Sequence, residues 1–317
     1  MKILVSGAAG FIGSHLGEAL AKDGHQVLGF DNFDPYYPRE VKEKNLSFPQ
    51  RFPNFSFVFA DLRDTPAIEK LVVDFVPDAI IHLAAKAGVR PSILDPMGYF
   101  VTNVNGTIGL LEAARKVGTA TFLLASSSSV YGSRQAVPFC EDDPVDFPVS
   151  PYAASKRACE LGAYTYSSLY GMKISALRFF TVYGPRQRPD LAIASFVQKM
   201  SQGQPIPFFG DGSTQRDYTY IDDLIQGVQG ALRWTAQAPA GTFEIFNLGE
   251  SKTISLTDLV ATLELVLGKK AILDKKPAQP GDVPRTYADI QKARRVLGYD
   301  PNVELQEGLT RYLESLN

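Results

Sequence analysis

The sequence lacks the features that would mark a disulfide-rich, membrane-spanning or repetitive protein. Its two cysteines, Cys140 and Cys159, cannot form a disulfide framework, so a reducing compartment is the simplest setting. No apolar run approaches the ~20 residues of a transmembrane helix. We find no internal repeat and no low-complexity segment. A globular protein without covalent cross-links is therefore expected.

An excess of charge of one sign is also lacking. The chain has 32 lysines and arginines against 34 aspartates and glutamates, which gives a net charge of −2 at pH 7. This balance does not indicate a nucleic-acid or membrane partner. The first strand-like run begins at Ile3, so we expect no signal peptide and a cytoplasmic protein. We assign no metal ligands, and a length of 317 residues suggests about two domains.

Three glycines stand near the N-terminus at regular spacing. Gly7, Gly10 and Gly13 follow the apolar run Ile3–Val5 and precede a helical pattern. Strand, glycine turn and helix form the context in which a glycine triplet binds a pyrophosphate. The turn needs residues without a β-carbon so that the backbone can approach the phosphates. An ordinary glycine-rich turn remains the alternative for this motif taken alone.

An acidic residue ends the second strand-like run. Gln26–Phe30 leads directly into Asp31, roughly 20 residues beyond the glycines, where a ribose 2′-hydroxyl would be bound. Its carboxylate can accept a hydrogen bond from that hydroxyl but would repel a 2′-phosphate. The two signals together predict a dinucleotide site that takes NAD and not NADP.

The first half of the chain alternates apolar runs with helical patterns, which predicts a parallel sheet with helices on both faces. We therefore expect an α/β fold with a Rossmann-type, doubly wound sheet. The predicted strands are Ile3–Ser6, Gln26–Phe30, Phe55–Ala60, Ala79–Leu83, Thr121–Ser126 and Lys173–Phe179. The predicted helices are Phe11–Asp23, Pro66–Phe75, Tyr99–Val117 and Pro151–Tyr170, and residues 32–53 form a long excursion.

Beyond Thr181, prolines and glycines become frequent among aromatics and arginines. We expect residues 1–180 to form the NAD-binding domain, with about 216–250 joining it. Residues 181–317 should form mainly a smaller mixed α/β domain that binds substrate and is interleaved with the first. The strand-like run Phe243–Asn247 could return to the first sheet. Later helices are predicted at Ile193–Ser201, Asp222–Trp234, Ser255–Leu267, Ala288–Leu297 and Leu305–Leu316.

Two further motifs suggest proton-transfer chemistry. Tyr152 and Lys156 are spaced i and i+4 in a helical stretch, so they share one face. An isolated tyrosine, with a pKa near ~10, is a poor base at neutral pH, but an adjacent ammonium favours the phenolate. The hydroxyls of Ser126–Ser129 follow the fifth strand and would face a ligand beside the cofactor. A chance surface pair and turn-forming serines are the alternatives for each motif alone.

Together these motifs resemble the extended short-chain dehydrogenase/reductase family, in its nucleotide-sugar epimerase and dehydratase branch. The resemblance covers essentially the whole chain. It is carried by Gly7–Gly13, which has Gly-x-x-Gly-x-x-Gly spacing, and by Asp61–Arg63, Ile81–Ala85, Asn103–Thr107, Arg178–Pro185, Arg216–Asp223 and Pro280–Pro284.

The resemblance implies a role for each matching residue. Tyr152 would be the base, Lys156 its partner and Ser127 a proton-relaying hydroxyl. The residues implied in cofactor binding are Gly7, Gly10, Phe11, Ile12, Gly13, Asp31, Asn32, Asp61, Leu62, Leu83, Ala84, Ala85, Lys86, Asn103, Tyr152 and Lys156. Those implied in substrate binding are Arg90, Ser128, Ser129, Thr181, Arg188, Arg216 and Asp282. Without the motifs, Arg188 and Arg216 would be interpreted as solvated surface charge.

Three places resemble the epimerases of this branch that act on UDP-glucuronate: Ala87–Arg90, Thr181 and Arg186–Asp190. A dehydratase would carry an Asp-Glu pair where Ser128 and Ser129 stand, and without it water elimination lacks its acid and base. The resemblance implies NAD-dependent 4-epimerisation of a UDP-sugar through a 4-keto intermediate, most simply UDP-glucuronate to UDP-galacturonate.

Other functions remain open at this point. They are a 4-epimerase of UDP-glucose or UDP-N-acetylglucosamine, a UDP-glucuronate decarboxylase, and a non-catalytic NAD-binding regulator. The resemblance also implies a homodimer, paired through the helices Tyr99–Val117 and Pro151–Tyr170. Leu110, Leu111 and Leu161 are among their apolar residues, although such residues could instead only cover the sheet.

Overall fold

A seven-stranded parallel sheet organises the chain, which the computed structural model describes over residues 1–277 and 283–316. Its strand order is β11-β6-β5-β4-β1-β2-β3, and every neighbouring pair runs parallel. The strands are β1 (Lys2–Ser6), β2 (Gln26–Asp31), β3 (Phe55–Phe59), β4 (Ala79–His82), β5 (Thr121–Ser127), β6 (Lys173–Phe179) and β11 (Phe243–Leu248). The predicted Rossmann-type sheet is confirmed.

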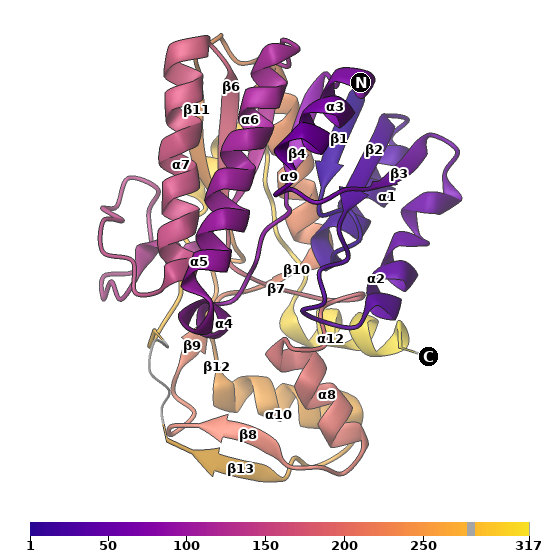
Figure 1. Ribbon diagram of the computed structural model, residues 1–317. Helices are drawn as coiled ribbons and strands as arrows, with labels where there is room; N and C mark the ends of the chain where they lie inside the picture. Colours follow the sequence, from indigo (N-terminus) through magenta and orange to yellow (C-terminus); the bar gives the residue numbers. More distant parts are fainter. Residues whose placement is uncertain (278–282, 317) are drawn as a thin grey trace.

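Helices cover both faces of this sheet (Figure 1). On one face lie α3 (Thr65–Phe75), α6 (Gly106–Lys116) and α7 (Pro151–Tyr170), which pack side by side. On the other lie α1 (Phe11–Lys22) and α9 (Ile221–Gln237), with α11 (Gln291–Leu297) packed against α9. The two faces bury separate apolar clusters, as a doubly wound sheet requires.

Local sequence sets the ends of α7, the helix that carries the tyrosine–lysine pair. Ser150 precedes it, and its hydroxyl accepts a hydrogen bond from the backbone N–H of Ala153. Pro151 occupies the first turn, where its missing N–H costs nothing. The helix ends at Gly171, whose φ of 69° is a left-handed conformation that glycine adopts without strain.

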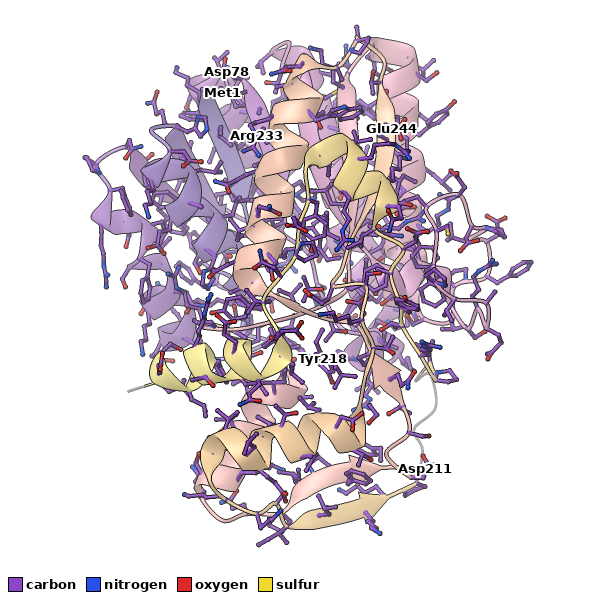
Figure 2. The ribbon with its side chains drawn as sticks, turned by 180° about the vertical axis from the view of Figure 1, so that it is seen from behind. Met1, Asp78, Asp211, Tyr218, Arg233 and Glu244 are labelled. Atoms are coloured by element: carbon purple, nitrogen blue, oxygen red, sulfur yellow. The ribbon has the colours of Figure 1, made fainter. Side chains whose placement is uncertain are left out.

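A smaller unit lies beyond the carboxyl ends of the strands. Figure 2 shows Met1 and Asp78, which precede β1 and β4, at the end of the sheet away from this unit, and Asp211 within it. Its elements and those that join it to the sheet are β7 (Thr181–Tyr183), β8 (Ile206–Phe209), β9 (Gln215–Arg216), β10 (Tyr218–Tyr220), β12 (Ile254–Ser255), β13 (Leu273–Lys276), α8 (Ala192–Ser201), α10 (Leu256–Leu267) and α12 (Leu305–Glu314). Ligands of open α/β sheets bind at this edge.

One long predicted helix is divided in the structure. The segment 99–117 consists of the end of α5 (Pro96–Tyr99), a π-helical turn over Phe100–Asn105, and α6. The carbonyl of Asn103 accepts hydrogen bonds from Thr107 Oγ1 at 2.5 Å and Cys159 Sγ at 3.2 Å. These two side chains donate to a backbone carbonyl within the π-helical turn. Such turns are frequent at functional sites.

Other boundaries also differ from the sequence-based expectation. The excursion 32–53 contains a helix, α2 (Arg39–Leu46), which starts directly after Pro38. A second short helix, α4 (Val89–Leu94), follows β4. The helix expected from Ala288 begins only at Gln291, because Ala288 forms an isolated β-bridge with Phe139. Within residues 1–277 and 283–316, no helix has the length and apolarity needed to cross a bilayer.

Candidate active site

A cavity of about 770 Å³ opens at the carboxyl edge of the sheet. It lies where the strand order reverses between β1 and β4, the topological switch point at which such sheets bind ligands. Of the sequence-predicted residues, it is lined by Gly7, Gly10, Phe11, Ile12, Gly13, Asp31, Asn32, Asp61, Leu62, Leu83, Ala84, Ala85, Lys86, Ser127, Ser128, Ser129, Tyr152, Lys156, Thr181 and Arg188. A cavity of this size fits a large ligand.

The glycine turn is packed so tightly that it excludes side chains. Gly7 has φ +72°, and a Cβ there would lie 2.9 Å from the backbone nitrogen of Ala84. A Cβ on Gly13 would lie only 2.0 Å from the carbonyl oxygen of Gly7. Gly10 precedes α1 and offers no side-chain cap, so the first N–H groups of the helix face the cavity unpaired by such a cap. These donors and the helix dipole fit a diphosphate.

Asp31 lies at the end of β2, buried beside a lysine. Its Oδ1 accepts a hydrogen bond from the backbone N–H of Phe33 at 2.8 Å, and Lys42 Nζ stands 3.9 Å from the same oxygen. Burial raises the pKa of Asp31, and Lys42 opposes that rise. Sequence reasoning missed Lys42, because no motif marks it within the excursion. The only signal was a basic residue in the segment that follows Asp31.

Asp61 is held by neighbours that saturate its carboxylate. Arg63 donates to both carboxylate oxygens, at 2.9 and 2.6 Å, and Asn32 Nδ2 donates to Oδ2 at 3.0 Å. The Arg63 hydrogen bond is the main reason that the pKa of Asp61 lies well below its usual range. Asp61 is therefore a fixed anion at the cavity wall, and it orients Asn32.

Asn103 supports the cavity from behind its wall. It is 1% exposed and does not line the cavity among the described residues. Its Oδ1 accepts from the backbone N–H of Lys86 at 2.8 Å, and its Nδ2 donates to Ser155 Oγ on α7 at 2.9 Å. The Lys86 ammonium, in turn, donates to Asp95 at 2.7 Å. Asn103 thus connects the segment after β4 to the helix that carries Tyr152.

The three predicted catalytic residues share one wall of the cavity. Lys156 is buried, and its Nζ donates to the carbonyl of Ala125 on β5 at 2.8 Å. Ser127 Oγ accepts a hydrogen bond from the backbone N–H of Ser129 at 3.1 Å. This bond caps a short 3₁₀ turn that begins at Ser128. The Tyr152 ring meets Tyr99 edge to face, with ring centres 6.2 Å apart. A hydroxyl, a phenol and an ammonium can transfer or stabilise a proton here.

The predicted substrate residues divide into two groups. Ser128, Ser129, Thr181 and Arg188 line the cavity, whereas Arg90 and Arg216 do not belong to its described lining. The guanidinium of Arg90 lies 5.3 Å from the centre of the Phe209 ring in the smaller unit. Arg216 Nη1 donates to the carbonyl of Gln215. Asp282 lies outside the described residues.

Arg188 is already paired in this structure. It donates two hydrogen bonds to Asp190, at 3.0 and 2.8 Å, and lies 5.2 Å from the centre of the Tyr36 ring. Tyr36 Oη also donates to Asp190. Tyr36, like Tyr37 and Tyr99, lines the cavity and was not singled out from the sequence. Its only signal was the cluster of aromatics in the excursion 32–53.

A glycine turn at the switch point of a parallel sheet, with a tyrosine–lysine pair in the same cavity, defines an extended short-chain dehydrogenase/reductase. The chain belongs to the GDP-mannose 4,6-dehydratase family of this class, whose family model matches residues 4–312. The family resemblance inferred from the motifs is thus confirmed.

Individual relatives are similar over their whole length. The chain is 43% identical over 309 residues to a UDP-glucuronate 4-epimerase of Thermodesulfobacterium geofontis, covering 97% of this chain and 94% of that protein. The structure of a UDP-glucuronic acid 4-epimerase from Bacillus cereus, in complex with UDP-glucuronic acid and NAD, matches with a TM-score of 0.93 at 39% identity, covering 100% of this chain and 99% of that one. A UDP-glucose 4-epimerase from Thermotoga maritima matches with a TM-score of 0.90 at 32% identity, covering 100% and 98%.

The packing of the glycine turn predicts the effect of one methyl group. Gly13→Ala should abolish tight NAD binding, because the new Cβ would meet the Gly7 carbonyl and force the turn apart. The measurement is the NAD content of the purified protein, together with its melting temperature. Gly109→Ala in α6 is the control, since the atoms nearest to its Cβ belong to the side chain of Thr65, at 3.3 Å or more. A Gly13→Ala protein that retains a full complement of NAD would contradict this role for the turn.

Proposed function

We propose that the chain catalyses NAD-dependent 4-epimerisation of UDP-glucuronate to UDP-galacturonate. One observation carries the proposal: a single cavity joins the glycine turn to Ser127, Tyr152 and Lys156, and the next residues along its wall are Ser128 and Ser129. The match to the Bacillus cereus enzyme, whose structure contains UDP-glucuronic acid and NAD, supports the same substrate and cofactor.

The cofactor would be held by the turn and by the ends of β2 and β4. The helix N–H groups after Gly10 would face its diphosphate, and Asp31 with Lys42 would face the adenosine ribose. Leu62 would lie beside the adenine, and Lys86 beside the nicotinamide half. Bound NAD⁺ would supply the redox chemistry, as the acceptor of a hydride from C4 of the sugar and the donor that returns it to the 4-keto carbon.

The chain's own residues would move the proton. Tyr152 takes the proton from the C4 hydroxyl, and Ser127 hydrogen-bonds the same oxygen and relays the proton. Lys156, buried one helical turn from Tyr152, stabilises the phenolate with its positive charge. The resulting 4-keto sugar turns over within the cavity before Tyr152 returns the proton. A base that works in both directions suits an epimerase, which has no net redox change.

The substrate carboxylate would lie beside the carbon that is oxidised. The hydroxyls of Ser128, Ser129 and Thr181 would hold it, and several neutral donors can do so in both orientations of the sugar. Arg188 would face the nucleotide diphosphate after exchanging its Asp190 partner. For Arg90 on α4, for Arg216 on β9 and for Asp282, we propose contacts to the nucleotide sugar.

Two alternatives on the same fold fit the cavity less well. A dehydratase needs an acid–base carboxyl pair after the strand-end serine, and Ser128 and Ser129 provide none. A UDP-glucuronate decarboxylase would leave the carboxylate free to depart, whereas three hydroxyls line the cavity where the carboxylate would be held. A 4-epimerase of a neutral UDP-hexose is the second candidate, and the match to the UDP-glucose 4-epimerase of Thermotoga maritima supports it.

We further propose how the chain is divided and where it works. Residues 1–180, with about 216–250, form the NAD-binding domain, and most of 181–317 forms the nucleotide-sugar domain. The parallel pairing of β11 with β6 supports this interleaving.

For the compartment, we propose the cytoplasm. Cys140 and Cys159 are both free thiols, which supports a reducing environment.

A homodimer through the α6–α7 face is also proposed. Leu110 and Leu111 are fully buried and cover the sheet, but Leu161 and Leu169 on α7 are 52% and 71% exposed. Met97 of α5, the neighbour of α7, is exposed as well. Exposed apolar side chains gathered over packed helices are typical of a protein–protein interface.

Products identify the reaction directly. We expect NMR to show that the protein converts UDP-glucuronate into a mixture with UDP-galacturonate, with no pentose product and much slower turnover of UDP-glucose and UDP-N-acetylglucosamine. Preferred turnover of UDP-glucose would instead favour a 4-epimerase of a neutral UDP-hexose.

Tyr152→Phe should keep bound NAD and lose about 10²–10⁴-fold or more in kcat, because it removes only the proton acceptor. A Tyr152→Phe enzyme near wild-type activity would place the base elsewhere.

Thr181→Val tests the carboxylate contact. A hydrogen bond to a charged group contributes roughly 1.5–3 kcal/mol, so kcat/KM for UDP-glucuronate should fall about tenfold or more relative to that for UDP-glucose. Thr219→Val is the matched control, since Thr219 is buried on the neighbouring strand β10 and lies outside the described cavity lining. An unchanged ratio of the two kcat/KM values would remove Thr181 from the carboxylate site.

The dimer is tested by mass. Light scattering at micromolar concentration should give twice the 34.7 kDa chain mass for the wild type. Leu161→Arg should shift this toward the monomer by placing a charge in the interface. Leu265→Arg is the control, because Leu265 is 66% exposed on α10 of the smaller unit. A wild-type mass of one chain would refute the dimer.

A further inference from the structure

Three polar residues lie side by side across the sheet, where a buried parallel sheet is otherwise apolar. Ser126 of β5 pairs with Arg178 of β6, which in turn pairs with Asn247 of β11. Their exposed fractions are 3%, 1% and 0%. The row's member on β5, Ser126, immediately precedes Ser127. Since buried polar groups are costly unless paired, something must satisfy this row.

Glu160 of α7 satisfies one end of it. Its two carboxylate oxygens accept from Arg178 Nε and Nη2, at 2.9 and 3.0 Å. Ser126 Oγ also donates to Glu160, at 2.6 Å, and Arg157 Nη1 donates to it at 3.2 Å. A buried carboxylate with this many donors is fixed in place, because turning it away from the arginine would leave both charges unpaired.

Glu160 shares a helix face with the catalytic pair. It lies one turn beyond Lys156 and two turns beyond Tyr152. Lys156 is bonded to the carbonyl of Ala125, and Glu160 to the hydroxyl of Ser126. Helix α7 is therefore attached to β5 at the two successive residues that precede Ser127. These attachments set the distance between Ser127 and the other two catalytic groups.

The other side of the serine segment is attached to the same ion pair. Tyr131 ends the 3₁₀ turn that begins at Ser128. Arg178 Nη1 donates to Tyr131 Oη at 3.0 Å, and that hydroxyl donates to Asn247 Oδ1 at 2.7 Å. The segment 127–130 is thus bracketed by Ser126 and Tyr131, both bonded to the Glu160–Arg178 pair.

We propose that Glu160 and Arg178 are positioning residues for the epimerase reaction, which act through Ser126 and Tyr131 on the segment 127–130. The proposal rests on the proposed function and deepens it. The buried ion pair fixes Ser127 against Tyr152 and Lys156, and it fixes Ser128 and Ser129 where the sugar carboxylate is held. Displacing a catalytic group by about 1 Å can cost about 10²-fold in rate.

The experiment avoids breaking the ion pair, since Glu160→Gln would leave a buried arginine unpaired and could unfold the chain. Ser126→Ala and Tyr131→Phe each remove one hydroxyl and retain shape. Ser167→Ala is the control: Ser167 is fully buried on the same helix, and its hydroxyl has no partner within the described residues. We measure kcat and KM for UDP-glucuronate, bound NAD per chain, and hydrogen exchange of peptides covering residues 124–132.

Ser126→Ala and Tyr131→Phe should each lower kcat by about tenfold or more, with KM and bound NAD unchanged, because the loss is in the transition state alone. Exchange in the peptides covering 124–132 should speed up in both variants and stay at the wild-type rate in Ser167→Ala. A fall in kcat no larger than that of Ser167→Ala would overturn the proposal. So would unchanged exchange, or a kcat loss matched by equal loss of bound NAD.

The exchange measurement separates this inference from the proposed function. A wild-type protein that turns over no UDP-sugar would overturn the function, while faster exchange in Ser126→Ala and Tyr131→Phe would still show that the ion pair holds the segment. Conversely, an active wild type whose variants exchange and react like Ser167→Ala would retain the function and reject the positioning role.

Discussion

The close approach of β1 to β4 is the contact on which the rest of the structure depends. Where β1 ends, Ser6 Oγ accepts hydrogen bonds from the backbone N–H groups of Leu83 and Ala84, both at 3.0 Å. The Ser6 hydroxyl can therefore donate its proton to His82 Nδ1, 2.7 Å away. Burial lowers the pKa of His82 to about 3, so the ring is neutral. Gly7 follows at once, against the same backbone. Because these two strand ends are tied together, the crevice above them has a fixed floor, and both the cofactor turn and the segment to Lys86 start from it.

Several charged side chains at the cavity are paired with oppositely charged neighbours. Lys86 is bonded to Asp95, Arg188 to Asp190 and Arg63 to Asp61. On the proposed function, the diphosphate of the nucleotide sugar would have to replace the Asp190 carboxylate at Arg188. Such an exchange would lower the net gain from Arg188, and it would make binding selective for ligands that replace both hydrogen bonds of the guanidinium fork.

The sequence predicted what depends on local pattern. The strand–glycine–helix unit at Gly7–Gly13 and the i, i+4 spacing of Tyr152 and Lys156 are properties of a few neighbouring residues, so they could be inferred without coordinates. Features that depend on distant partners could not. Lys42 is next to Asp31 only because the excursion brings α2 to the end of β2. The row Ser126–Arg178–Asn247 exists only because three strands far apart in sequence share one register. The π-helical turn at 100–105 likewise depends on Cys159 of another helix.

The interleaved course of the chain also has a mechanical consequence. After β6 the chain leaves the large sheet through β7, returns through β10 into α9 and β11, and leaves again through β12. Figure 2 shows Tyr218 of β10 at the junction of the two parts. Parts joined by several strands cannot swing freely, as they could on a single linker. The parallel pairing of β7 with β10 ties the outgoing segment to the returning one at this junction, so any relative movement of the two parts has to bend both segments together.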